Sequence, residues 1–296
     1  MKTLRSNHIS PLPALDLSHL QSVRVLPKSC PNLHMIQVGC GGIGAYLAGS
    51  TARIARECVR LFEHVRISFF DGDQIEEKNI RRQNFCQSEV GQNKAETLAF
   101  RLNAAWGLNI EAVPLHFDGS YHHLGTRNET LTILLGCVDT AAARQTMHRA
   151  IADQTLERDG QIWWIDGGNG SVHGQVCVGN TGRADVLAKG FDLPTVCTAL
   201  PSPAWLHPEL LTPLPDEHPR RRQSCADLAI LDPQSLTINS VIAAHMSDYV
   251  LRLVTRDLRR FATYIDMDSG SVRSLAITPT QLQRSIPPSS SERSVA

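Results

Sequence analysis

The chain has 296 residues, of which 42% are hydrophobic, a composition typical of a globular protein with one large domain or two small ones. Its 29 basic and 29 acidic residues give a formal net charge of zero, which argues against a general affinity for nucleic acid or an anionic membrane. The apolar runs are shorter than the ~20 residues of a membrane span, and the N-terminus lacks the apolar core of a secretory signal, so we expect a cytoplasmic protein.

From residue 33 to about 190, short apolar runs alternate with stretches of helical periodicity. Strands are predicted at 34–38, 65–70, 110–114, 131–136 and 161–165, and helices at 44–60, 91–107 and 140–158. Such alternation is typical of right-handed βαβ units around a mostly parallel sheet. A further strand at 173–178 alternates polar and apolar residues, which indicates an antiparallel edge strand. We therefore predict an α/β, Rossmann-like fold with helices on both faces of the sheet and antiparallel edge strands.

The second part of the chain begins with a proline-rich segment. Seven prolines lie between 194 and 219, and because proline cannot continue a helix or a central strand, a crossover loop is predicted over about 192–224. A helix is predicted at 239–261, with an apolar face wide enough to pack on the sheet or on a second subunit.

The end of the chain is predicted to add a hairpin and a tail. The hairpin strands are expected at 264–266 and 272–277. The predicted organisation is an N-terminal arm at 1–32, one domain at 33–277 and a disordered tail at 278–296.

A glycine-rich turn, Gly39-Cys-Gly41-Gly42-Ile-Gly44, follows the first predicted strand and directly precedes a helix. In such a turn, backbone N–H groups and the positive end of the helix dipole face a nucleotide phosphate. Asp71 follows the next strand, where dinucleotide-binding folds place the acid that binds the ribose. Alone, the turn would indicate NAD.

The residues beyond Asp71 favour ATP over NAD. Arg82 and Lys94 carry the charge needed to neutralise a triphosphate, and NAD has no third phosphate. Asp139 follows the strand at 131–136 and offers an oxygen ligand for Mg²⁺, a cation that favours carboxylates and substrate phosphates. The eight cysteines contain no CxxC pair, which argues against a four-cysteine zinc site.

Together these motifs resemble the ThiF/MoeB/E1 family of ATP-dependent activators of ubiquitin-like proteins. The matching motifs, in family order over residues 35–180, are Val38-Gly-Cys-Gly-Gly-Ile-Gly44, Asp71-x-Asp73, Asn79-x-x-Arg82-Gln83, Gly91-x-x-Lys94 and Asp139-x-x-x-x-Arg144. The segments that begin at Ser224-Cys225 and Asn239 resemble the family's return from its crossover loop. The proline-rich loop is similar to that of ThiF-type proteins of bacterial PRTRC systems. Thr140 stands where the family has asparagine.

The resemblance implies a set of site residues. Those implied for nucleotide binding are Gly39, Gly41, Gly42, Gly44, Asp71, Asp73, Asn79, Arg82, Gln83 and Lys94. Those implied for catalysis are Arg82, Lys94, Asp139 and Cys225, with Asp139 as the Mg²⁺ ligand. The implied reaction uses ATP and Mg²⁺ to adenylate the C-terminal carboxylate of a small ubiquitin-like protein, with transfer to a cysteine as a further step. A homodimer is also expected.

Individual cysteines and histidines are either candidate nucleophiles or structural residues. Cys225 is the first candidate nucleophile because the arginines at 220–222 would lower its pKa, although a thiol that caps the next helix is the alternative. Cys197 is the second candidate, and Cys40 is interpreted as a small filler. His207 and His218 lack metal-ligand spacing and are predicted to lie on the surface.

Three other functions stay open from the sequence. One is a catalytically weak scaffold subunit of the same fold. Another is an ATP-dependent activator of a small molecule or a tRNA base, against which the zero net charge argues in the tRNA case. The third is an NAD dehydrogenase.

Overall fold

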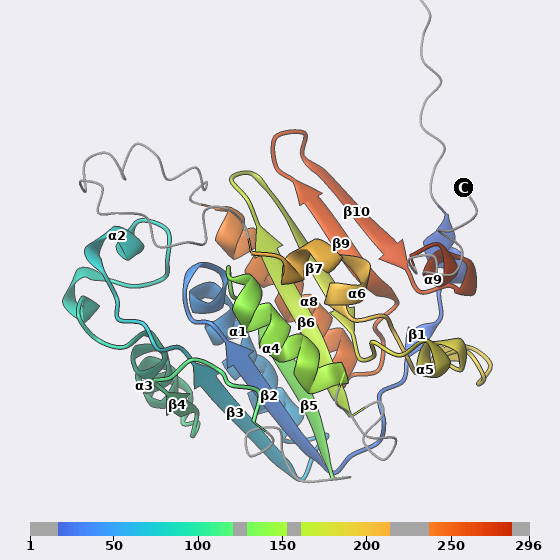
Figure 1. The fold of residues 1–296 in the computed structure, drawn as a ribbon. Coiled ribbons are helices and arrows are strands. Elements are labelled where there is room, and N and C mark those ends of the chain that lie inside the picture. Colours follow the sequence, from blue (N-terminus) through green and yellow to red (C-terminus); the bar gives the residue numbers. More distant parts are fainter. Residues whose placement is uncertain (1–16, 121–128, 153–160, 214–236, 286–296) are drawn as a thin grey trace, which may run out of the picture.

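A computed structural model of the chain describes residues 17–120, 129–152, 161–213 and 237–285. An eight-stranded sheet forms its centre, with the strand order β10-β9-β7-β6-β5-β2-β3-β4 (Figure 1). The strands are β2 (Asn32–Val38), β3 (His64–Phe70), β4 (Glu111–Val113), β5 (Thr130–Gly136), β6 (Ile162–Asn169), β7 (His173–Gly179), β9 (Arg260–Asp266) and β10 (Ser271–Ala276). The strands from β4 to β6 pair in parallel, and β7, β9 and β10 add antiparallel neighbours.

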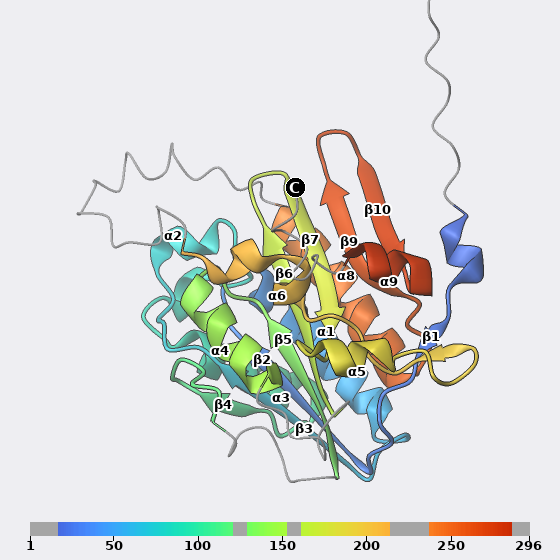
Figure 2. The same ribbon diagram turned by 45° about the vertical axis from the view of Figure 1, so that its right-hand side comes forward.

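Helices cover both faces of this sheet, as Figures 1 and 2 show. One face is covered by α1 (Gly42–Cys58), α3 (Lys94–Trp106) and α8 (Ile238–Val254), and the other by α4 (Ala141–Ala152), α6 (Pro203–Leu206) and η4 (Pro208–Leu211). Alternate residues of β2 face the two layers: Met35 joins the larger core beneath α1 and α8, and Ile36 joins the smaller core beneath α4. The predicted α/β, Rossmann-like fold is confirmed.

Several predicted boundaries are wrong, among them the end of a helix and the end of a strand. The helix predicted to reach 261 ends at Val254, and Phe261 belongs to β9. The strand predicted to end at 165 continues to Asn169, so Asp166 and the two glycines after it lie within β6. In both places the backbone is set by pairing or capping that the local sequence pattern does not reveal.

Helix α8 packs on its own chain. Its apolar stripe, which includes Ile242, Met246, Tyr249 and Leu253, is fully buried against α1, β6 and β7. The wide apolar face predicted for this helix is therefore covered by the sheet, and it gives no support to a dimer. The strands β9 and β10 form the predicted hairpin.

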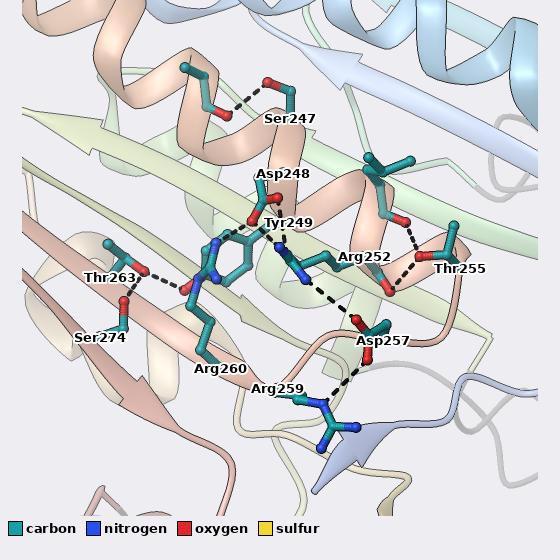
Figure 3. A network of polar contacts seen from close by, with 12 residues as sticks. Ser247, Asp248, Tyr249, Arg252, Thr255, Asp257, Arg259, Arg260, Thr263 and Ser274 are labelled. Atoms are coloured by element: carbon teal, nitrogen blue, oxygen red, sulfur yellow. Dashed lines mark hydrogen bonds and ion pairs between the residues drawn. The ribbon is translucent and has the colours of Figure 1, made fainter. Parts of the chain in front are cut away.

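A polar network fixes the second half of α8 to the hairpin (Figure 3). Asp248 accepts hydrogen bonds from Arg252 at 2.9 Å and from Arg260, which also lies over the Tyr249 ring. The Tyr249 hydroxyl lies 2.8 Å from the hydroxyl of Thr263 in β9. These contacts tie the C-terminal half of α8 to the hairpin.

The segments outside the main sheet contain short elements. Strand β1 (Arg24–Val25) pairs in parallel with β8 (Val196–Cys197), so the N-terminal region contacts the crossover segment. The other elements are η1 (Ser18–Gln21), α2 (Glu77–Ile80), η2 (Gln87–Glu89), α5 (Ala184–Ala188) and α9 (Pro279–Ser285). No helix in the described ranges is both long and apolar enough to span a membrane.

Candidate nucleotide site

The glycine turn lies at the carboxyl end of β2, where the parallel strands end together. Gly39 has a φ of +92°, and a Cβ atom there would lie 2.5 Å from the carbonyl oxygen of Cys137. At Gly44 a Cβ atom would lie 2.1 Å from the Gly39 carbonyl oxygen. Both positions therefore require glycine, and the turn packs closely against the residues that follow β5.

A buried glutamine that the sequence analysis missed holds this turn together. The Nε2 atom of Gln37 donates hydrogen bonds to the carbonyl oxygens of Gly39 at 3.2 Å and Gly44 at 3.1 Å. Gln37 is fully buried, next to the last residue of a strand that is otherwise rich in apolar residues. A lone amide at that position is the signal that could have identified it, because buried polar groups need partners.

Asp71 connects the glycine turn to the end of β3. Its Oδ2 atom accepts a hydrogen bond from the Cys40 N–H at 2.6 Å, and its Oδ1 atom accepts one from the Asp73 N–H at 2.8 Å. Burial raises the pKa of Asp71 above its ordinary value, and these two hydrogen bonds and nearby Lys94 oppose the rise. Both carboxylate oxygens thus hold backbone groups, and the role of Asp71 toward a ribose stays a prediction.

Lys94 and Asp73 form an ion pair at the same edge of the sheet. The Lys94 Nζ atom lies 2.9 Å from the Asp73 Oδ2 atom. The Lys94 side chain is 8% exposed, whereas the Asp73 side chain is 59% exposed. Lys94 is the first residue of α3, whose N-cap Asn93 also donates a hydrogen bond to the Asp71 carbonyl oxygen at 2.8 Å. A buried ammonium at a helix N-terminus is suited to an anion, and Asp73 is the accessible carboxylate.

The loop that carries Arg82 and Gln83 lies over the glycine turn. Gln83 is buried beside Gly41, and its Oε1 atom accepts no hydrogen bond from the described residues. Asn79 is buried too, and its Oδ1 atom accepts the Glu76 N–H at 2.9 Å, which caps the short helix α2. A polar ligand beside the turn would satisfy the Gln83 oxygen.

A second residue that the sequence analysis did not assign, Asn239, joins three segments at this site. Its Nδ2 atom donates to the Arg82 carbonyl oxygen at 3.1 Å, and its Oδ1 atom accepts from Asn169 at 3.2 Å. A Cβ atom on Gly42 would lie 2.8 Å from Asn239 Oδ1. The first turn of α8 thus locks the Arg82 loop against the start of α1.

Asp139 lies on the loop between β5 and α4, exposed to solvent. The hydroxyl of the following Thr140 accepts a hydrogen bond from the Ala143 N–H at 3.4 Å and so caps α4. Among the residues that the structure describes, no three His, Cys, Asp or Glu side chains could hold a metal by themselves. Mg²⁺ would take most of its ligands from phosphates and water, as Mg²⁺ usually does, and one carboxylate fits that need.

Arg144, the last residue of the Asp139 motif, forms a buried ion pair with Asp166. Its Nε atom lies 3.3 Å from the Asp166 Oδ2 atom in β6. Burial raises the pKa of Asp166, and the guanidinium of Arg144 offsets part of this rise. This pair links α4 to the sheet beneath the Asp139 loop.

The two candidate nucleophiles have different outcomes. Cys225 and the arginines at 220–222 lie outside the described residues, so that assignment stays a prediction. Cys197 is fully buried in β8, its Sγ atom donates to the Ala199 carbonyl oxygen at 3.1 Å, and burial raises its pKa to about 12. A buried, protonated thiol is no nucleophile, and the candidacy of Cys197 is wrong. Cys40 is buried in the turn, as a filler would be.

His207 is not the surface histidine that we predicted. Its side chain is 19% exposed, its Nε2 atom lies 2.8 Å from the Tyr264 hydroxyl, and its Nδ1 atom lies 2.9 Å from the Glu209 Oε1 atom. It fastens the crossover segment to β9. His218 lies outside the described residues.

The sheet topology and the helices on both of its faces define an α/β protein of the Rossmann-like type. The ThiF family matches residues 28–285, and the chain belongs to that family. No curated protein matches the chain.

Several solved structures share the fold at low sequence identity. PaaA aligns with a TM-score of 0.51 and 16% identity, over 82% of this chain and 64% of that one. Escherichia coli MccB crystallised with ATP aligns with a TM-score of 0.53 and 17% identity, over 82% of this chain and 63% of MccB. MccB with AMPCPP and MccA aligns with a TM-score of 0.51 and 16% identity, over 83% of this chain and 64% of that one. This chain thus spans less than two thirds of each of these proteins.

Proposed function

We propose that this protein uses ATP to adenylate the C-terminal carboxylate of a peptide or small protein. The observation that carries the proposal is the convergence of the glycine turn, buried Lys94 and accessible Asp73 at one edge of the sheet in a ThiF-family chain. Two helices, α1 and α3, begin at that edge, and helix N-termini favour phosphates. Similar structures of MccB contain ATP, or AMPCPP together with MccA.

The proposed reaction forms one bond and breaks one. A carboxylate oxygen of the partner attacks the α-phosphorus of ATP, the bond to the β-phosphate oxygen breaks, and pyrophosphate leaves. Arg82 and Lys94 would stabilise the charge that builds on the phosphate oxygens, and preorganised charge of this kind is usually the largest catalytic effect. Asp73 would release Lys94 to the phosphates, and Asp71 would accept hydrogen bonds from the ribose. When bound, Mg²⁺ would add positive charge at the phosphates near Asp139.

The finer assignments belong to the same proposal. The partner is a small ubiquitin-like protein with a free C-terminus, and the chain is of the PRTRC type. The Cys225 thiolate attacks the carbonyl carbon of the acyl-adenylate, the bond to the AMP oxygen breaks, and a thioester and AMP result. The protein acts as a cytoplasmic homodimer. Membership of the ThiF family supports this class of partner, because the ThiF/MoeB/E1 proteins that the sequence resembles activate ubiquitin-like proteins.

The test is ATP–pyrophosphate exchange with candidate ubiquitin-like partners. We expect Asp139→Ala to abolish exchange, and Asp268→Ala, which changes an exposed carboxylate in the β9–β10 turn, to leave it unchanged. Cys225→Ala should keep exchange but remove any thiol-sensitive adduct with the partner. Full exchange by Asp139→Ala would refute the assignment of Asp139 as the metal ligand. A wild-type protein that catalyses no exchange with any partner that has a free C-terminal carboxylate would refute adenylation.

A further inference from the structure

A separate cavity of about 450 Å³ lies beside the β1–β8 pair. Figures 1 and 2 both show β1 next to α5, which forms one of the walls. Asn180, another wall residue, follows β7, whose last residue pairs with Trp164 near the start of β6. The cavity therefore lies at the edge where the parallel strands begin, opposite the glycine turn.

The cavity has an excess of positive charge. Three cationic side chains line it, those of Lys28, Lys189 and Arg256, against one carboxylate, that of Asp185. Arg183, which is not part of the wall, already pairs with Asp185 at 2.6 Å. Because Arg183 already neutralises Asp185, Lys189 and Arg256 place two positive charges on the wall, which a phosphate dianion would balance.

Arg256 occupies a backbone position that normally requires glycine. Its φ is +59°, and it lies in the capping turn that follows α8. In this turn the Arg256 N–H donates to the Leu253 carbonyl oxygen at 3.2 Å, and the Asp257 N–H donates to the Arg252 carbonyl oxygen at 2.8 Å. Glycine usually fills this place because a side chain is strained there. The Arg256 Nη2 atom donates instead to the Ser29 hydroxyl on the cavity wall, at 3.2 Å. Strain of this kind concentrates at functional positions.

The rest of the wall is suited to a body that is mainly apolar. Leu26, Val186 and Ala199 supply apolar surface, and Ser29 and Thr198 supply hydroxyl groups. The volume lies within the range of roughly 300–1,000 Å³ that small-molecule sites have. Arginine binds an oxyanion through two parallel N–H groups, and lysine adds a point charge, a combination suited to phosphate.

We propose that this cavity binds a small phosphate monoester with an apolar body, with the phosphate on Arg256 and Lys189. The proposal does not depend on the adenylation reaction, because the cavity and the glycine turn lie at opposite edges of the sheet.

Phenyl phosphate is the probe that tests it, titrated into the full chain by calorimetry. We expect Arg256→Gln and Lys189→Gln each to weaken its binding about tenfold, the usual size of one charged hydrogen bond. Arg53→Gln, which removes a guanidinium stacked on Trp106 in another region, should leave the affinity unchanged. Lys94→Gln should also leave it unchanged. Loss of binding in Lys94→Gln and not in Arg256→Gln would place the probe at the nucleotide edge and overturn the proposal.

Two further arms test the ligand class and the strain. Phenol and benzoate should bind at least about tenfold more weakly than phenyl phosphate, since they lack the dianion. Equal binding of either one would overturn the phosphate assignment. Arg256→Gly should raise the melting temperature by about 2 °C as it relieves the left-handed backbone, and should weaken phenyl phosphate binding as Arg256→Gln does. Undiminished binding by this variant would contradict a role for the guanidinium.

Discussion

Gly44→Ala is the change that the structure predicts most sharply. The new Cβ atom would lie 2.1 Å from the Gly39 carbonyl oxygen and 3.1 Å from the Gln37 Nε2 atom. Both contacts are with the residues that shape the glycine turn, and the first is with backbone, which cannot rotate away. Gly49, five residues later in the same helix, is the matched control because a Cβ atom there would meet nothing within 4 Å.

The two changes should therefore have opposite effects. To reach an ordinary contact, the Gly39 oxygen and the start of α1 must separate by roughly 1 Å, and such overpacking costs about 3 kcal/mol when the neighbour is backbone. Gly49→Ala removes a flexible residue from a helix interior and should stabilise by about 0.5–1 kcal/mol. For a chain of this size these values correspond to a melting temperature about 8 °C lower for Gly44→Ala and about 2 °C higher for Gly49→Ala.

Thermal and urea unfolding, each with and without ATP, measure both effects. The stabilisation by ATP should fall in Gly44→Ala, because a displaced turn no longer presents its N–H groups to phosphate, and should persist in Gly49→Ala. If Gly44→Ala is as stable as the wild type and binds ATP equally well, the described turn is incorrect.

Three other predictions concern Asp166, Glu111 and Cys197. Asp166→Ala leaves the guanidinium of Arg144 buried without its partner, so the free energy of unfolding should fall by about 3–5 kcal/mol in urea denaturation, and a loss below about 1 kcal/mol would contradict the buried pair. The Ser68 hydroxyl lowers the pKa of Glu111 below its ordinary 4.5, so the ionised carboxylate stabilises the fold above that pH. The free energy of unfolding of the wild type should therefore exceed that of Glu111→Gln by less and less as the pH falls below 4.5. A difference that grows there would contradict the prediction. Cys197 should resist iodoacetamide near neutral pH until the chain unfolds, and peptide mapping that finds it alkylated in the folded protein would contradict its burial.

The sequence predicts the central layers of this fold because their signals are local. Parallel strands such as β2 and β5 are rich in apolar residues, and the helix between β2 and β3 has clear periodicity. The end of α8 could not be predicted, because Arg256 takes the left-handed conformation without the glycine that usually signals it. The strand predicted to end at 165 continues to Asn169, because pairing with β7 keeps the two glycines after Asp166 in the strand.

The candidate site is predictable in part for the same reason. The glycine turn is dictated by steric contacts among neighbouring residues, so its spacing is visible in the sequence. The partners of Asp71 and Asn239 come from segments distant along the chain, and only the folded structure reveals that one ties the turn to β3 and the other ties α8 to the Arg82 loop. The burial of Cys197 also depends on its pairing with β1, which no local pattern announces.

The proposed chemistry is tested most directly by the products of the reaction. The chain, ATP, Mg²⁺ and a candidate partner with a free C-terminus are incubated with hydroxylamine, which traps activated carboxylates, and nucleotides and partner are analysed by mass spectrometry. We predict a hydroxamate at the partner's C-terminus with an equal amount of AMP, and loss of both in Lys94→Gln. A hydroxamate accompanied by ADP, or AMP formation that Lys94→Gln leaves undiminished, would contradict adenylation at this site.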